Sequence, residues 1–110
     1  LAPDGTAFEL LLSFGASAAG PAEPRAGLVE VSGGRLAGTT RIGGDADQGT
    51  LFTVRTNGTS LSVRQSFTGT GGGGARPRSP LLYTPGGVAY GMTFGGGTAD
   101  QGVVFRHFLP

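Results

Sequence analysis

The sequence predicts an all-β fold made of two four-stranded units of the propeller-blade type. Three observations lead to this prediction: a repeat with a period of 53 residues, short runs in which apolar and polar residues alternate, and glycine-rich turns between those runs. The 23 glycines and 7 prolines in 110 residues would otherwise suggest a disordered chain. A disordered chain has no reason to keep its glycines and phenylalanines in register, so we expect a folded protein.

The repeat register defines the organisation of the chain. Its clearest matches are Gly38 with Gly91, Phe52 with Phe105, Ala46–Gly49 with Ala99–Gly102, and Ser13-Phe14 with Ser66-Phe67. We therefore expect an N-terminal strand and connection in residues 1–20, a complete first repeat in 21–73, and a second repeat in 74–110 that contains three strands.

The first repeat is expected to contain four strands. In chain order they are Leu28–Val31, Arg35–Thr40, Thr50–Thr56 and Thr59–Phe67. A Ser-Gly-Gly turn separates the first two, and Asn57-Gly58 before the last predicts a type I′ hairpin turn. Leu61, Val63 and Phe67 alternate with polar residues in the last strand, which is typical of a half-buried strand.

The second repeat is expected to contain only the first three strands. They are Leu81–Thr84, Val88–Thr93 and Val103–Phe108. The register places Ala7–Phe14, at the other end of the chain, in the position of a fourth strand. Four antiparallel strands in 40 to 50 residues is the size of a propeller blade, which favours a propeller over another repeated sheet.

An unfinished second blade predicts assembly with copies of the same chain. We expect the N-terminal strand of one copy to complete the last blade of another, or the chain to be a segment of a longer repeat protein. Because propellers have roughly 4 to 8 blades, a trimer with a six-bladed ring is preferred and an open filament is second. The residues expected to carry assembly are Phe8, Leu10, Leu12, Phe14, Val103 and Phe105.

The glycine-rich motifs resemble a known repeat family. The motif Gly33–Thr40, the doublet Gly43-Gly44 and the run Gly49–Phe52 return as Val88–Thr93, Gly95–Gly97 and Gly102–Phe105. This pattern is similar to the GloVer tandem repeats of bacterial surface and secreted proteins, with Ala37 at a usual tyrosine and Met92 at a usual threonine. The resemblance implies a propeller-like, extracellular or cell-surface bacterial protein, and it implies no defined activity.

Composition argues against several functional classes. A net charge of +1 gives no basic surface for a nucleic-acid backbone, and no apolar run reaches the roughly 20 residues of a membrane helix. The sequence contains no nucleophile elbow, zinc signature or phosphate-binding loop, and His107 is its only histidine. We therefore expect a protein that is not an enzyme and needs no cofactor.

Repeated polar residues provide the candidate ligand site. With the four strands of a blade labelled a to d in chain order, these residues lie on the b–c and d–a loops, which are expected to emerge at one end of each blade. The residues are Arg25, Asp47, Gln48, Arg78, Asp100 and Gln101. One interpretation is that each arginine pairs with the aspartate of its repeat as a structural clamp. The alternative is a lectin-like ring in which these groups bind glycans multivalently. The aspartate loops also suit Ca²⁺, although bonding of each aspartate to nearby backbone N–H groups is preferred.

Overall fold

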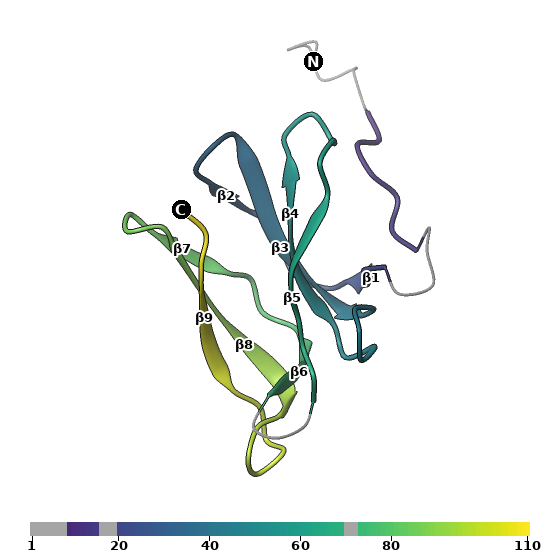
Figure 1. Ribbon diagram of the computed structural model, residues 1–110, viewed down its shortest axis with the longest axis vertical. Helices are drawn as coiled ribbons and strands as arrows, with labels where there is room; N and C mark the ends of the chain where they lie inside the picture. Colours follow the sequence, from purple (N-terminus) through teal and green to yellow (C-terminus); the bar gives the residue numbers. More distant parts are fainter. Residues whose placement is uncertain (1–8, 16–19, 70–72) are drawn as a thin grey trace.

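The protein is all-β, with two antiparallel sheets that do not close on themselves. The computed structural model describes residues 9–15, 20–69 and 73–110, and these residues form nine strands and no helix (Figure 1). The strands are β1 (Ala22–Pro24), β2 (Val29–Val31), β3 (Arg35–Ile42), β4 (Thr50–Arg55), β5 (Ser62–Ser66), β6 (Gly74–Pro77), β7 (Leu82–Thr84), β8 (Val88–Gly96) and β9 (Val104–Phe108).

The two sheets repeat one topology. In sheet 1 the order is β1-β3-β4-β5, with β2 beside β1 on the same edge of β3. In sheet 2, β6 and β7 share one edge of β8 in the same way, and β9 pairs with its other edge. Strands β6 to β9 therefore match β1 to β4, and among the described residues sheet 2 has no counterpart of β5.

Seven of the nine strands overlap the strands that the sequence predicts, and the short strands β1 and β6 are additions. Both lie in connections that were expected to be irregular. They form because β3 and β8 continue past Thr40 and Thr93, where Ala22 pairs with Ile42 and Ala75 with Gly95.

The turn between β4 and β5 differs from the predicted type I′ turn. A type I′ turn needs a positive φ at both Asn57 and Gly58, but of these two only Gly58 has one, 87°, and its N–H donates to the Arg55 carbonyl at 2.8 Å. Asn57 instead accepts hydrogen bonds from the backbone N–H and hydroxyl of Thr59 through Oδ1. The type I′ prediction was wrong because the asparagine side chain stabilises a longer turn, which delays β5 until Ser62.

The predicted N-terminal strand is absent from the described part of Ala7–Phe14. Residues 9–15 have no strand pairing in the structure, and Ala7 and Phe8 lie outside the described residues. An extended segment becomes a strand only when another strand accepts its hydrogen bonds, and sheet 1 already has β5 at that edge.

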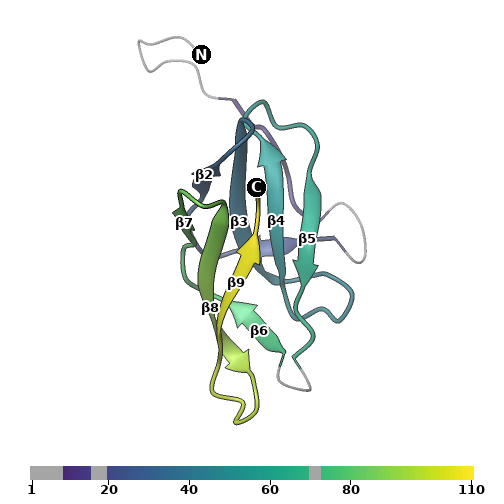
Figure 2. The ribbon, with the colours of Figure 1, turned by 60° about the vertical axis from the view of Figure 1, so that its left-hand side comes forward.

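The hydrophobic core lies between the two sheets. Sheet 1 contributes Val31, Ala37 and Leu51 to this core. We call the side of sheet 1 that carries these residues and Val29 its inner face. The inner face of sheet 2 contains Tyr83, Ala89 and Phe105, and Leu81, Phe67 and Leu109 fill the space between the sheets. Figures 1 and 2 show sheet 2 against one side of sheet 1, with the N-terminal segment along the other side.

Buried threonines line the strand pair β3 and β4. The hydroxyls of Thr40 and Thr50 are 2.7 Å apart, and Thr40 also donates to the Ile42 carbonyl at 3.0 Å. The neighbouring Thr39 is only 2% exposed, yet its hydroxyl has no hydrogen-bond partner in the described part of the chain. A buried hydroxyl without a partner destabilises a fold by about 1 to 3 kcal/mol.

We expect Thr39→Val to stabilise the protein by about 1 kcal/mol, because valine has the same shape and removes the unpaired hydroxyl. Thr40→Val is the matched control and should destabilise it by about 1 to 3 kcal/mol, because it leaves buried groups of Thr50 and Ile42 unpaired. Urea unfolding of both variants measures the two changes. Equal destabilisation by both substitutions would contradict the prediction.

Candidate functional site

The two aspartates of the predicted ligand site stabilise their own loops. Asp47 Oδ1 accepts a hydrogen bond from Gly43 N at 2.8 Å, and Asp100 Oδ1 accepts one from Gly96 N at 2.9 Å. Both aspartates have a positive φ, 54° and 53°. The preferred interpretation, in which each aspartate bonds to nearby backbone N–H groups, is confirmed.

The two arginines do not pair with these aspartates. Arg25 lies 3.7 Å from Glu23 Oε1, and the same carboxylate accepts two hydrogen bonds from Arg41. In the second repeat, the position of Arg41 is Phe94, and the guanidinium of Arg78 lies 4.7 Å from its ring centroid. The predicted arginine–aspartate clamp was therefore wrong, because each arginine contacts a nearer residue of its own sheet edge.

The glutamines of the predicted site lie in the same loops. The Gln48 carbonyl accepts a hydrogen bond from Arg76 N at 2.7 Å, which joins the loop of sheet 1 to the first strand of sheet 2. Its counterpart Gln101 is exposed. In the described parts of the chain no three histidine or acidic side chains gather as a metal site would require. Ligand binding by these residues stays a prediction.

His107 lies on the inner face of sheet 2, directly opposite Ala89 on the neighbouring strand. It is half-buried and lines a hollow of about 380 Å³ together with Gln65, Phe67 and Phe105. The hollow lies beside the edge of β9 that faces away from β8. In sheet 1, β5 occupies the corresponding edge of β4.

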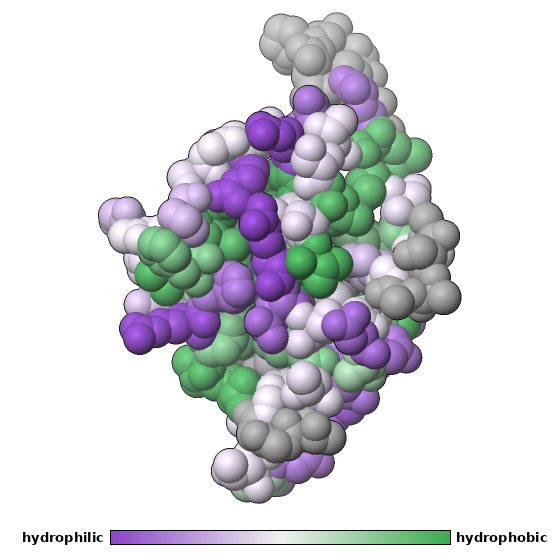
Figure 3. All heavy atoms as spheres, in the orientation of Figure 1, coloured by the Kyte–Doolittle hydropathy of each residue, from purple (hydrophilic) through white to green (hydrophobic). Residues whose placement is uncertain are grey.

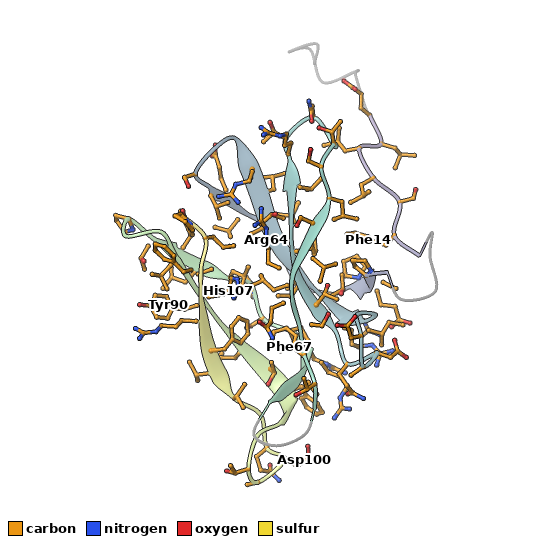
Figure 4. The ribbon with its side chains drawn as sticks, in the orientation of Figure 1. Phe14, Arg64, Phe67, Tyr90, Asp100 and His107 are labelled. Atoms are coloured by element: carbon orange, nitrogen blue, oxygen red, sulfur yellow. The ribbon has the colours of Figure 1, made fainter. Side chains whose placement is uncertain are left out.

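Two phenylalanine pairs show how the N-terminal segment is placed. Phe14 packs edge-to-face on Phe52, with centroids 5.2 Å apart and an interplanar angle of 67°. Phe67, which follows β5, packs on Phe105 with values of 5.1 Å and 61°. Both pairs obey the 53-residue register, and Figure 4 shows Phe14 and Phe67 on different sides of sheet 1. Phe14 therefore contacts sheet 1 in the same way as Phe67, at the end of β5, contacts sheet 2.

The side of sheet 1 opposite its inner face is its outer face, and it carries Leu28, Leu36, Phe52 and Val54. With the N-terminal segment it encloses an apolar pocket of about 310 Å³. Leu28 is 57% exposed at this pocket. Figure 3 shows an apolar patch along the N-terminal segment, where Leu10 and Leu11 are exposed.

Sheet 2 exposes the largest set of apolar side chains in the described structure. The side of the sheet opposite its inner face, its outer face, carries Leu82, Tyr90, Met92, Val104 and Phe108. Val104 is 76% exposed, whereas its counterpart Leu51 in sheet 1 is fully buried. This face was not predicted from the sequence, which assigned assembly to the N-terminal strand and to Val103 and Phe105 of the last strand. Its signal was the apolar residue at every second position from Val88 to Phe94.

The edge of β9 that faces away from β8 also has no strand beside it in the described residues. Thr93 N donates to the Val103 carbonyl at 2.9 Å, so alternate residues from Val103 onward direct their backbone groups toward β8. The N–H and C=O groups of Val104 and Arg106 therefore point to the other edge. Within the described residues β9 pairs only with β8.

Comparison of the chain with protein-family models, curated proteins and solved structures found no match in any of the three. The described residues also contain no helix long and apolar enough to cross a membrane.

We expect Asp100→Asn to keep the stability of the loop near that of the native protein, because asparagine retains the Oδ1 acceptor and tolerates a positive φ. Asp100→Ala should lower the free energy of unfolding by about 1 kcal/mol. Thermal unfolding with and without Ca²⁺ measures both effects. A Ca²⁺-dependent rise in Tm that Asp100→Asn abolishes would show instead that the loop is a metal site.

Proposed function

We propose that this chain is a non-enzymatic structural module that assembles with copies of itself by strand exchange, as a propeller-like ring. One observation carries the proposal: the Phe14–Phe52 pair reproduces the Phe67–Phe105 pair in both distance and angle. The N-terminal segment thus lies where the fourth strand of a preceding sheet would end. Strand β9 belongs to a sheet that lacks its fourth strand.

The path of the chain after each phenylalanine supports the same placement. Gly15 N donates to the Pro21 carbonyl at 3.2 Å, and Gly69 N donates to the Gly74 carbonyl at 3.0 Å. The acceptors Pro21 and Gly74 are equivalent in the 53-residue register, and the donors Gly15 and Gly69 differ by one position. Each bond lies between a phenylalanine and the short strand that follows it, β1 or β6. This similarity supports a placement of the N-terminal segment like that of β5.

The repeat specifies the register of the exchanged strand. Strand β4 pairs with β5 as Thr50 with Ser66 and Leu51 with Gln65, followed by a bulge and Phe52 with Val63. The equivalent pairs between two copies are Val103 with Ser13, Val104 with Leu12 and Phe105 with Leu10. This pairing satisfies the outward backbone groups of Val104 and Arg106. It also places Leu10, which is 79% exposed in the single chain, against a strand.

A closed ring of three copies is the preferred assembly. Each chain supplies two sheets, and propellers have roughly 4 to 8 blades, so three copies give a six-bladed ring. If the rotation between copies does not close, the same contacts produce a filament. A bacterial cell-surface or extracellular location is part of the proposal and is supported by the repeat resemblance alone.

We expect Arg106→Pro to weaken assembly at least tenfold. Proline removes the N–H that points to the free edge of β9, and it leaves the bonds from β9 to β8 intact because those come from Phe105 and His107. Arg106→Ala is the matched control, since it removes the side chain and keeps the N–H. Sedimentation velocity over a range of concentrations measures the assembly of both variants.

Two results would count against strand exchange. The first is an Arg106→Pro variant that assembles over the same concentration range as Arg106→Ala. The second is native protein that remains an 11.0 kDa monomer at every concentration tested. Circular dichroism of the proline variant at low concentration should match that of the native chain, which establishes that its sheets are intact.

A further inference from the structure

We infer that the outer face of sheet 2 docks on the outer face of sheet 1 of a second copy, in the arrangement that joins the two sheets inside one chain. The inference rests on the proposed self-assembly and identifies its main contact surface. Strand exchange alone joins two edges and leaves both outer faces in water. The docking surface is a different part of the molecule from the strand edge, so it is tested separately.

The internal repeat relates each exposed face to a buried one. The inner face of sheet 1 contains Val29, Ala37 and Leu51, and the outer face of sheet 2 carries Leu82, Tyr90 and Val104 at the equivalent positions. Leu51 and Ala37 are fully buried by sheet 2. The corresponding face of sheet 2 is covered by nothing in the described structure. Figure 4 shows Tyr90 on the side of sheet 2 that faces away from sheet 1.

The receiving face repeats in the same way. Inside the chain, Leu81 is 6% exposed and packs over Gly91 and the Phe105 ring, where a side chain at residue 91 would clash with both. Leu28 packs over Gly38 and the Phe52 ring in the same manner, but it is 57% exposed. Leu28 therefore has the position and the surroundings of Leu81 without the opposing sheet.

A groove on the outer face of sheet 2 matches this leucine. It has a volume of about 350 Å³ and is lined by Pro80, Leu82, Tyr90, Met92 and Val104. Residues equivalent to Leu82, Tyr90 and Val104 surround Leu81 in the core cluster of the chain. We therefore place Leu28 of one copy in this groove of the next copy.

A backbone hydrogen bond gives the register of docking. Arg76 N donates to the Gln48 carbonyl at 2.7 Å across the internal interface, and Arg76 has a φ of 55°. Its counterpart Glu23 has a φ of 58° and is likewise skipped in the pairing of its strand. The equivalent bond between copies joins Glu23 N to the carbonyl of Gln101, which is exposed in the single chain.

The contact is head-to-tail because two different faces meet. Each copy then offers the outer face of sheet 2 to one neighbour and the outer face of sheet 1 to another. Copies continue to add until a ring closes. A symmetric dimer would instead bring two outer faces of sheet 2 together. These arrangements give different results when variants with a single blocked face are mixed.

The test uses lysine substitutions at exposed positions, which leave the fold of the single chain intact. Leu82→Lys with Val104→Lys blocks the outer face of sheet 2, and Leu28→Lys blocks the outer face of sheet 1. We expect each variant alone to be monomeric at concentrations where the native protein assembles. An equimolar mixture should form a heterodimer and nothing larger, since only one pair of native faces remains.

The matched control is Leu82→Met with Val104→Ile, which keeps the face apolar and should assemble as the native protein does. Assembly of the double lysine variant at native concentrations would overturn the inference. Dimerisation of Leu28→Lys alone would also overturn it, because it would show that two outer faces of sheet 2 meet. A mixture that remains monomeric would exclude the head-to-tail contact.

Failure of this inference can be told apart from failure of the proposed function. If the native protein assembles and Arg106→Pro weakens assembly, while the double lysine variant assembles normally, strand exchange stands and face docking is wrong. If Arg106→Pro assembles normally and the lysine variants do not, docking stands without strand exchange. A native protein that is always monomeric contradicts both.

Discussion

The packing of the two inner faces is the interaction on which the rest of the structure depends. A sheet with one apolar face is stable only when that face is buried against another layer. Sheet 1 buries Leu51 and Ala37 against Leu81 and Ala89, and this contact is the only sheet-on-sheet core in the described residues. Each fully buried aliphatic side chain of leucine or valine size contributes about 1.5 to 3 kcal/mol, which is a large fraction of the roughly 5 to 15 kcal/mol net stability of a typical domain.

The same packing requires glycine at two equivalent positions. A Cβ at Gly91 would lie 2.6 Å from the Phe105 ring and 2.9 Å from Leu81, and a Cβ at Gly38 would meet Phe52 and Leu28 at similar distances. The glycines therefore let a phenylalanine ring and a leucine lie flat on the sheet. This flat, apolar surface is what another sheet can pack against, and sheet 1 carries one such surface that no other sheet covers.

Much of the fold could be predicted from the sequence, and the errors have identifiable causes. The 53-residue register of glycines and phenylalanines predicts both sheets. Few other residues can replace this pair, because the phenylalanine ring packs directly over the glycine. Strands β1 and β6 escaped prediction because their short sequences gain strand geometry only from the extended ends of β3 and β8. The Asn57 turn was assigned from a dipeptide preference, whereas the structure depends on a side-chain bond to Thr59.

The candidate site was less predictable, because contacts between sheets cannot be read from spacing along one chain. Arg25 and Asp47 recur together in the sequence, but the structure gives each a separate local partner. The outer face of sheet 2 was visible as alternation in β8, yet alternation does not say which side of a strand another layer covers. That information came from the repeat, once the buried faces of sheet 1 were known.

Residue differences between the two repeats make the outer face of sheet 2 more apolar than the equivalent inner face of sheet 1. Thr39, Arg41 and Arg55 of sheet 1 are replaced by Met92, Phe94 and Phe108. A face that only meets water gains nothing from such changes, since exposed apolar patches promote association. The face that lacks a partner inside the chain is therefore more apolar than the equivalent face that has one. A surface of this composition is stable in solution when a second layer covers it, and in our proposal that layer is the outer face of sheet 1 of another copy, where Leu28 is exposed above Gly38.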